Sequence, residues 1–372
     1  MLDGFKAFID LLSTPSISFT LLLVTFPFIF PPTAWFESWH RRLGIHHLWT
    51  NRGGLGMFIA LTLFMLLGFA DPNFSKILSK PDNVPILILI YTAGFFLWLA
   101  MKSAYANDAR LAAGEPVEER GSPDDKVLVW PDLVYIELIA LILMTIFLIV
   151  WSVGLPAPLE EPANPTLSPN PAKAPWYFLG LQEMLVYFDP WLAGVIFPTF
   201  IIIGLMAIPY IDSDRATSGY FSFDRRRVGI FIFMTGWLVL WVFLIVVGTF
   251  FRGPNWNFFG PFEEWSVAKV VPLTNVNLSE YVWVKLLAVG LPTQALLREI
   301  VGILIVLFYF GLPPVLLARG KLRPLVERIG PTRYALIVFL ALAMISLPIK
   351  MYLRWTINLK YIIAMPEYFF NI

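Results

Sequence analysis

The segment that decides the fold class is LVYIELIALILMTIFLIVWSVGL, residues 133–155, in which Glu137 is the only charged side chain. A helix needs about 20 apolar residues to cross roughly 30 Å of hydrocarbon. In the bilayer core, every backbone polar group must be satisfied within the protein, and a helix does this by itself. The segment therefore predicts a transmembrane helix, and we place it at residues 131–154.

Seven further apolar runs of similar length lie on either side of this helix. Hydrophobic residues make up 58% of the 372-residue chain and charged residues 14%, more apolar surface than one water-soluble core can hide. We predict an all-α integral membrane protein with about eight transmembrane helices, the last interrupted by Pro348 and Lys350, and a short amphipathic helix at the N-terminus. The predicted spans are 16–33, 54–71, 84–102, 131–154, 190–211, 228–250, 298–318 and 333–353.

Charge indicates the orientation of the spans rather than a polyanionic partner. Lys and Arg total 27 against 26 Asp and Glu, so nothing in the net charge favours binding to nucleic acid. Sixteen basic residues fall in the loops after spans one, three, five and seven, ten fall on the other side, and Arg298 lies at a span boundary. Basic loops stay in the cytoplasm. We therefore expect a multi-pass protein of the cell's inner (plasma) membrane, with both termini outside.

Two predicted outer loops are unusual. Residues 155–189, between spans four and five, are rich in proline, which fixes φ and removes hydrogen-bond donors, so we expect no helix there until near the end. Residues 251–297 are rich in aromatic side chains that suit a membrane-interface belt. These aromatic residues are Trp256, Phe258, Phe259, Phe262 and Trp265.

Four motifs, in order, resemble subunit IV of the cytochrome bf complex, the C-terminal part of the cytochrome b family. They are WPDLVY (130–135), EPANP (161–165), APWYFLG (174–180) and IPYID with a downstream FDRRR (208–212 and 223–227). In the family, a similar Glu-Pro-Ala-Asp-Pro precedes Pro-Glu-Trp-Tyr at the interval that separates Glu161 from Tyr177 here. The resemblance implies that Pro175, Trp176, Tyr177 and Phe178 line a quinol oxidation site on the outer face.

One position departs from that motif. Proline stands at 175 where the family has the glutamate that is usually assigned as the acceptor of a quinol proton. Tyr177 is then the hydrogen-bonding candidate, with a tyrosine of the interfacial belt as the alternative. Glu183 is the nearest replacement carboxylate, and its alternative is a surface or helix-capping role. On one straight helix, Tyr177 and Glu183 would lie about 240° apart and would not share a face.

On the inner face, Asp132 matches the carboxylate that in the family belongs to the quinone reduction site. The alternative is an aspartate stabilised by the helix dipole. Glu137 lies five residues deeper, where an ionisable group is a functional candidate by default.

The family's N-terminal half holds two b haems between four histidines on two spans, and this chain has three histidines in one inner loop: His40, His46 and His47. Three clustered histidines cannot ligate two haems, so we assign haem b to a partner subunit. For the loop itself, we favour solvated side chains over a metal site. The chain has no cysteine, which excludes disulfides and iron–sulfur ligation by this polypeptide.

We therefore interpret the chain as a membrane subunit of a cytochrome bc/bf-type complex that binds quinol and quinone and has no metal of its own. The expected partners are a cytochrome b N-terminal-like subunit with haem b, a Rieske iron–sulfur protein, cytochrome c and lipids. A structural subunit with a decayed quinol site and a non-redox transporter remain alternatives; the sequence shows no internal repeat of the kind common in transporters. We divide the chain into residues 1–103, of unassigned function, 104–250, the cytochrome b-like region, and 251–372, an aromatic loop with two spans.

Overall fold

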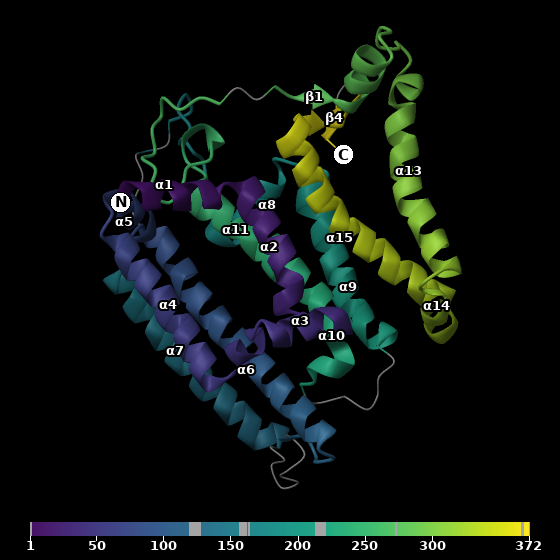
Figure 1. Cartoon of the computed structure of the whole chain (residues 1–372). Coiled ribbons are helices and arrows are strands. Elements are labelled where there is room, and N and C mark those ends of the chain that lie inside the picture. The colour runs from purple at the N-terminus through teal and green to yellow at the C-terminus, as the bar shows by residue number, and fades with distance from the viewer. Residues whose placement is uncertain are drawn as a thin grey trace.

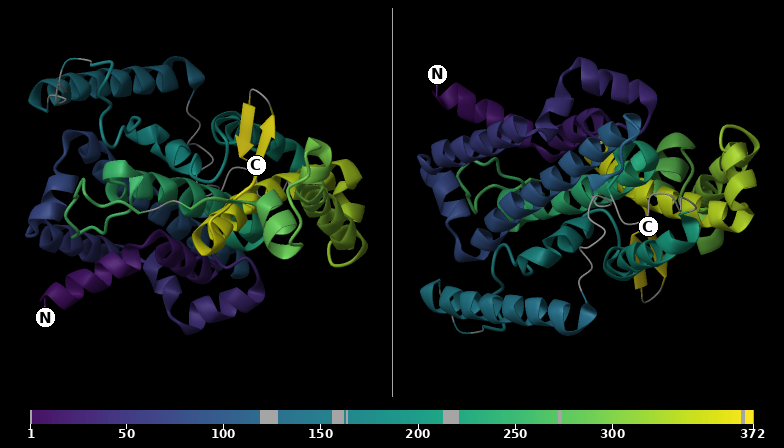
Figure 2. Two further views of the ribbon diagram at one scale, coloured as in Figure 1. Left: turned by 90° about the horizontal axis from the view of Figure 1, so that it is seen from above. Right: turned by 90° about the horizontal axis from the view of Figure 1, so that it is seen from below.

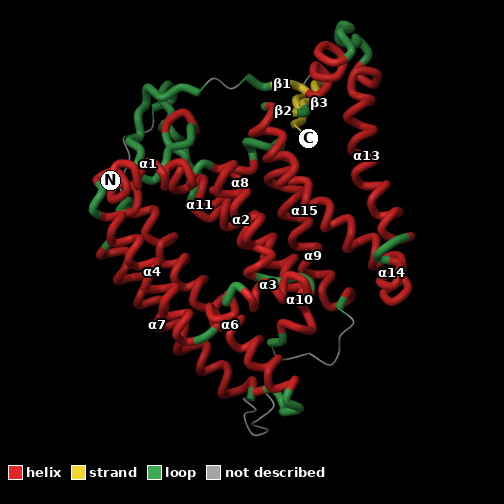
Figure 3. Tube along the Cα trace, in the orientation of Figure 1, coloured by secondary structure: helices red, strands yellow, loops and turns green. Residues whose placement is uncertain are grey.

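The computed structural model of the chain describes residues 2–118, 128–155, 162, 164–212, 221–271, 274–365 and 368–371. Glu161 and Ala163 of the EPANP motif lie outside these residues, as do Arg120, Lys126 and Arg215 of the predicted inner loops. Helices dominate the described part, and its strands are four short ones near the C-terminus (Figure 3). The all-α prediction is confirmed.

Among the described residues, seven helices are long and apolar enough to cross a membrane, and each coincides with one of the last seven predicted spans. Pro348 does not break the last of them, which runs unbroken from Pro331 to Ile357. These seven helical segments are Asn51–Phe69, Pro81–Ala112, Val129–Gly154, Leu192–Ile211, Phe223–Phe251, Ala295–Arg319 and Pro331–Ile357.

The first predicted span differs from the others. Its helix, α2 (Pro15–Ile29), has 15 residues, which at 1.5 Å per residue gives about 22 Å, too short to cross the hydrocarbon alone. It follows the predicted N-terminal helix, α1 (Leu2–Ser13), at a bend of 73°, and the two count as an eighth span only together. The bend falls where Thr14 leaves helical geometry ahead of Pro15.

The remaining elements connect or terminate these spans. Long spans are assembled from consecutive pieces with slightly different helical hydrogen bonding. The α-helices are α3 (Ala34–Arg42), α4 (Asn51–Phe69), α5 (Pro72–Leu78), α6 (Val84–Ala112), α7 (Val134–Gly154), α8 (Leu179–Met184), α9 (Phe197–Ile211), α10 (Phe223–Met234), α11 (Phe243–Val246), α12 (Leu278–Glu280), α13 (Ala295–Arg319), α14 (Arg323–Ile329) and α15 (Pro331–Ile357). The 3₁₀ or π segments are η1 (Ile45–Trp49), η2 (Pro81–Asn83), η4 (Val129–Leu133), η5 (Trp176–Phe178), η6 (Leu192–Ile196), η7 (Thr235–Val242), η8 (Val247–Phe251), η9 (Pro254–Trp256) and η10 (Tyr281–Leu286).

Two small strand pairs lie beyond the spans. Strand β1 (Val276–Asn277) pairs in parallel with β2 (Leu359–Lys360), and β3 (Ile362–Met365) pairs antiparallel with β4 (Tyr368–Asn371). The β1–β2 pair connects the loop after η8 to the end of α15. Both termini lie at the same end of the bundle (Figure 1), which we call the termini end.

The core forms where α2, α8, the α10–η8 span and α15 meet. Phe19, Leu244 and Met351 are almost completely buried there. Gly180 and Gly248 permit the close approach of α8 to the α11–η8 segment, since a Cβ atom at either position would lie 3.1 Å from an atom of the other element. The short helix that follows the predicted quinol-site motif is therefore fixed against the central span.

Helix α7 is packed quite differently. No residue in the most apolar stretch of the Val129–Gly154 span is buried. In the corresponding stretch of the Phe223–Phe251 span, 28% of the residues are buried. Figure 2 shows α7 apart from the rest of the bundle in both views. Its faces are left to lipid or to other proteins.

The aromatic loop after η8 folds inward, so the predicted membrane-interface belt is wrong for its central residues. Phe259 is fully buried, and Phe262 stacks on Phe74 of α5 at 5.5 Å between ring centroids. Helix α1 also holds this loop, because the Asp10 carboxylate accepts a 2.9 Å hydrogen bond from the Phe262 amide. The loop thus belongs to the folded termini end.

Candidate functional site

The described end of the proline-rich segment, from residue 164 onward, is fixed by its neighbours. In its described part, helix begins only at Trp176, as its prolines predict. The Gln182 side chain clamps the loop: its Oε1 accepts from the Ala174 amide at 2.8 Å, and its Nε2 donates to the Ala172 carbonyl at 2.8 Å. The side chains of Asn170 and Asn255 are hydrogen bonded at 2.9 Å. The proline-rich and aromatic loops therefore hold each other.

Glu183 is the centre of a closed polar cluster. Its side chain is 0% exposed, which rules out the alternative of a surface carboxylate. The Arg252 guanidinium donates to both carboxylate oxygens, at 2.6 and 2.9 Å. The Trp256 indole N–H donates to Oε2 at 3.1 Å, and the Tyr187 hydroxyl donates to Oε1 at 3.3 Å. We call these four residues the Glu183 cluster.

The Glu183 cluster ties α8 to the end of the central span. Arg252 also donates to the Trp256 carbonyl at 2.8 Å. Burial by itself lowers the pKa of Arg252, but the Glu183 carboxylate outweighs burial and the net effect raises it. The Arg252 guanidinium is therefore kept charged although it is buried, and it donates three hydrogen bonds there.

The predicted site residues divide between the interior and the surface. Trp176 is half-buried and packs against Phe250 and its neighbours. Tyr177 is 50% exposed and Phe178 is also exposed, with their rings 4.7 Å apart. Tyr177 and Glu183 thus point different ways, as the helical spacing predicted. Whether either contacts quinol stays a prediction.

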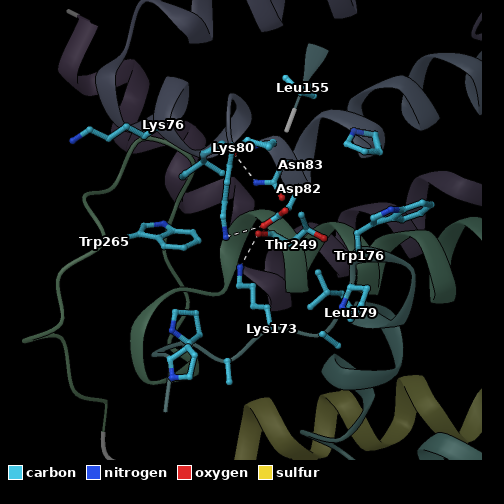
Figure 4. Close-up of a pocket in the computed structure, with 18 of the residues that line it drawn as sticks. Lys76, Lys80, Asp82, Asn83, Leu155, Lys173, Trp176, Leu179, Thr249 and Trp265 are labelled. Carbon is cyan, nitrogen blue, oxygen red and sulfur yellow. Dashed lines mark hydrogen bonds and ion pairs between the residues drawn. The ribbon is translucent and has the colours of Figure 1, made fainter. Parts of the chain in front are cut away.

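A cavity of about 1190 Å³ opens at the termini end beside this loop (Figure 4). Its walls come from the α5–α6 turn, the end of α7, the proline-rich loop and the aromatic loop. Pro175 and Trp176 line it, whereas Tyr177, Phe178 and Glu183 do not. Pockets of about 300–1,000 Å³ hold drug-sized molecules, so this cavity has room for an aromatic ring with part of a tail.

The cavity is lined by tryptophan and charged side chains. Trp151, Trp176 and Trp265 supply apolar surface. Lys80 forms an exposed ion pair with Asp82 at 3.2 Å. The Lys173 ammonium donates to the Thr249 carbonyl at 2.8 Å and lies 4.8 Å from the centre of the Trp265 ring. Burial above all, and then the charges of Lys80 and Arg252, lower the pKa of Lys173 to about 7.

Asp132 lies far from this cavity. It is exposed in η4, at the start of the 26-residue helix whose other end, at Trp151 and Leu155, lines the cavity. At 1.5 Å per residue the two ends are about 39 Å apart. The geometry therefore assigns Asp132 and Trp176 to opposite ends of the bundle. Glu137 is exposed on the same isolated helix.

The histidine loop corrects one expectation. His40 is not solvated but fully buried: its Nδ1 lies 2.7 Å from the Phe28 carbonyl, and its Nε2 lies 3.2 Å from the Tyr105 hydroxyl. Burial lowers the pKa of His40. With both ring nitrogens of His40 engaged, and the His46 and His47 rings only 4.0 Å apart, these residues do not fit bis-histidyl haem ligation.

Sequence reasoning missed Arg252, Lys173, Thr249 and Trp265 as site residues. The only signal in the sequence that could have found them was the predicted side of the membrane. The count of basic residues places Lys173 and Arg252 on the same side as the proline-rich loop. Contacts such as Lys173 to Thr249, 76 residues apart, follow no local spacing.

Comparison with known protein families supports the resemblance for the segment that builds this site. Residues 162–261 match the family model described as cytochrome b(C-terminal)/b6/petD. The match contains the proline-rich loop, the Glu183 cluster and Thr249, and it covers about a quarter of the chain. It begins after WPDLVY and extends past FDRRR into the aromatic loop. No solved structure matches the chain.

Proposed function

We propose that this chain, a multi-pass membrane protein with a cytochrome b C-terminal region at residues 162–261, is a subunit of a cytochrome bc/bf-type complex and forms the protein wall of its quinol oxidation site. The main support for this proposal is the cavity beside Pro175 and Trp176. In this proposal the termini end faces outward. Quinol gives its electrons to a Rieske cluster and a haem b on partner subunits, and cytochrome c receives them later.

The chemistry of the cavity supports a quinol better than a charged solute. Quinone and quinol carry the redox change themselves, so the protein has to supply position, hydrogen bonds and an exit for protons. Trp151, Trp176 and Trp265 offer flat apolar surface for a ring. The opening beside α7, a helix with no buried stretch in its apolar core, gives a lipid-soluble substrate a path from the bilayer.

The exposed residues fit the edge of such a site. Tyr177 and Phe178 present neighbouring rings outside the cavity wall. We propose that they face the partner subunit that completes the site, and that the Tyr177 hydroxyl hydrogen bonds to quinol there. Asp132, at the other end of α7, is proposed to serve an inner quinone site together with a partner.

Substituting Trp176 tests the cavity assignment. In the native complex purified from membranes, we expect Trp176→Ala to raise the KM for quinol roughly tenfold, the loss of about 1.4 kcal/mol of ring contact. The measurement is the quinol-dependent reduction rate of haem b. Trp191→Ala is the matched control, because Trp191 belongs to the same matched segment and is exposed away from the cavity.

Equal KM values for wild type, Trp176→Ala and Trp191→Ala would contradict the assignment. If Tyr177→Phe and Glu183→Gln also leave turnover unchanged, a structural subunit with a decayed quinol site is the better description. Purification of the intact chain without any haem b protein would favour a function outside electron transfer.

A further inference from the structure

Two residues that line the cavity each have a buried polar group with no hydrogen-bond partner within the described part of the chain. These groups are the hydroxyl of Thr249, a residue only 2% exposed, and the indole N–H of Trp265. Buried polar groups are nearly always paired with protein or water. Two unpaired ones in the wall of one cavity indicate a binding site for a molecule that supplies the missing partners.

Lys173 completes this set (Figure 4). Its Nζ makes a single hydrogen bond to a described residue, the 2.8 Å bond to the Thr249 carbonyl, and this bond fixes the amine at the Thr249 backbone. Lys173 also lines the cavity. We call Lys173, Thr249 and Trp265 the open cluster.

The open cluster fits one hydroxyl group of a hydroquinone. A threonine hydroxyl both donates and accepts, an indole N–H only donates, and a neutral lysine amine has one lone pair that can accept a proton. A hydroquinone hydroxyl likewise donates and accepts. A purely apolar lipid chain would leave the Thr249 hydroxyl and the Trp265 indole N–H unpaired.

We propose that Lys173 is a catalytic residue that accepts a proton from a quinol hydroxyl held beside Thr249, in the place where proline has replaced the motif glutamate. This inference rests on the proposed function. Pro175 itself has no group that can take a proton, and Lys173, two residues before it, lies in the same cavity wall.

The proposed step is a simple proton transfer. The quinol O–H bond breaks, its electron pair stays on the oxygen to give a quinolate, and the proton forms a new N–H bond on the Lys173 amine. The two electrons leave the quinolate for two one-electron acceptors on the partner subunits, an iron–sulfur centre and a haem. The proton of the second hydroxyl is released to water at the cavity opening, so that quinol gives quinone, two electrons and two protons. The Trp265 ring, 4.8 Å from Nζ, stabilises the ammonium that forms.

The electrostatic surroundings of Lys173 favour the transfer of a proton to its amine. Burial, Lys80 and Arg252 lower the pKa of Lys173 and Glu183 raises it, and the result of about 7 keeps part of the amine neutral near neutral pH. The other charged groups that line the cavity are Lys76, Asp82, Glu263 and Glu264. Of these, Asp82 and Glu264 are exposed and give the proton a route to water.

The test measures turnover against pH in the purified native complex, using short-chain menaquinol and benzoquinol analogues in parallel as donors. We expect wild-type turnover to rise as pH increases through about 7. Lys173→Met should lower turnover roughly 100-fold, the usual effect of losing a general base, and abolish that rise. Lys173→Glu should restore part of the activity and move the rise to lower pH, since a carboxylate replaces the amine.

Lys285→Met is the matched control, because Lys285 is an exposed lysine of η10 that does not line the cavity. It should keep the wild-type profile. If Lys173→Met does not assemble with haem, Lys173→Arg serves instead: it keeps a cation and a donor to Thr249 but cannot lose its proton. It should be as slow as expected for Lys173→Met.

Two failures can be told apart. If Trp176→Ala raises the KM for quinol but Lys173→Met or Lys173→Arg keeps the wild-type turnover and pH profile, the proton acceptor is another group and the proposal for Lys173 is wrong. If Trp176→Ala leaves the KM unchanged as well, the cavity is not the quinol site and the proposed function fails with it.

Discussion

The Glu183 cluster and the open cluster are neighbours with opposite properties. Arg252 of the first and Thr249 of the second are three residues apart at the end of one span, and each cluster contains a buried polar side chain, Glu183 in the first and Thr249 in the second. In the Glu183 cluster, Arg252, Trp256 and Tyr187 all donate to one carboxylate. In the open cluster, two buried groups have no described partner. One segment therefore contains a closed polar network that holds its shape and an open one that is available for binding.

The largest effect should come from breaking the closed cluster. Arg252→Met would leave the Glu183 carboxylate buried without its counter-charge, which costs about 3–5 kcal/mol. We expect a large fall in the denaturation temperature, or loss of assembly, measured by fluorescence-monitored unfolding of the purified complex.

A double variant provides the control for this prediction. Glu183→Met combined with Arg252→Met removes both charges and should recover most of the lost stability, because an apolar pair of similar volume is often neutral or better. If the single and double variants are equally unstable, packing rather than the ion pair holds α8 in place, and the contrast between the two clusters loses its basis.

A smaller effect should come from the open cluster. Thr249→Val keeps the side-chain shape and removes a hydroxyl that has no described protein partner, so the fold should be as stable as wild type or slightly more stable. The KM for quinol should rise roughly fivefold, the loss of about 1 kcal/mol for one hydrogen bond.

Thr199→Val is the matched control for this effect, since the Thr199 hydroxyl is already bonded to the Val195 carbonyl of its own helix, at 2.7 Å, and does not line the cavity. Its KM should equal that of wild type. A Thr249→Val complex with unchanged KM and raised stability would show that the hydroxyl is merely unpaired, and the distinction between closed and open clusters would then carry no functional meaning.

The sequence could predict the membrane spans but only part of the candidate site. Seven spans could be predicted because length and hydropathy alone determine them. The bend of 73° before α2 could not, because it depends on how α1 packs on the aromatic loop through Asp10 and Phe262. Pro175 and Trp176 were found through a motif, and the structure places both in the cavity wall.

Polar contacts between segments that are distant in the chain could not be predicted from the sequence. Glu183 was chosen because it is the nearest carboxylate to the motif. Its partner Arg252 lies 69 residues away, and no periodicity in the sequence connects the two. His40 was expected in solvent because its loop is basic, yet it is buried between the Phe28 carbonyl and Tyr105. Burial of one polar side chain in a charged loop is decided by tertiary packing, which composition does not encode.

The smallest predicted effect concerns the stability of the open cluster itself. The pKa of Lys173 is lowered from 10.5 to about 7 in the folded protein. Between these two values the unfolded chain binds the proton and the folded chain does not, so this residue makes stability rise with pH across that window. Below about pH 7 the folded protein has the full cost of a buried ammonium.

Lys173→Met removes that cost and should therefore raise the denaturation temperature most at about pH 6, with the gain over wild type shrinking as the pH approaches 10. Comparing each variant with wild type at every pH cancels the groups they share. For the exposed Lys285→Met variant, the difference from wild type should stay flat. A flat difference for Lys173→Met as well would mean that the amine keeps its proton in the folded protein throughout. The open cluster would then hold a permanent cation, suited to an anion rather than to a proton donor.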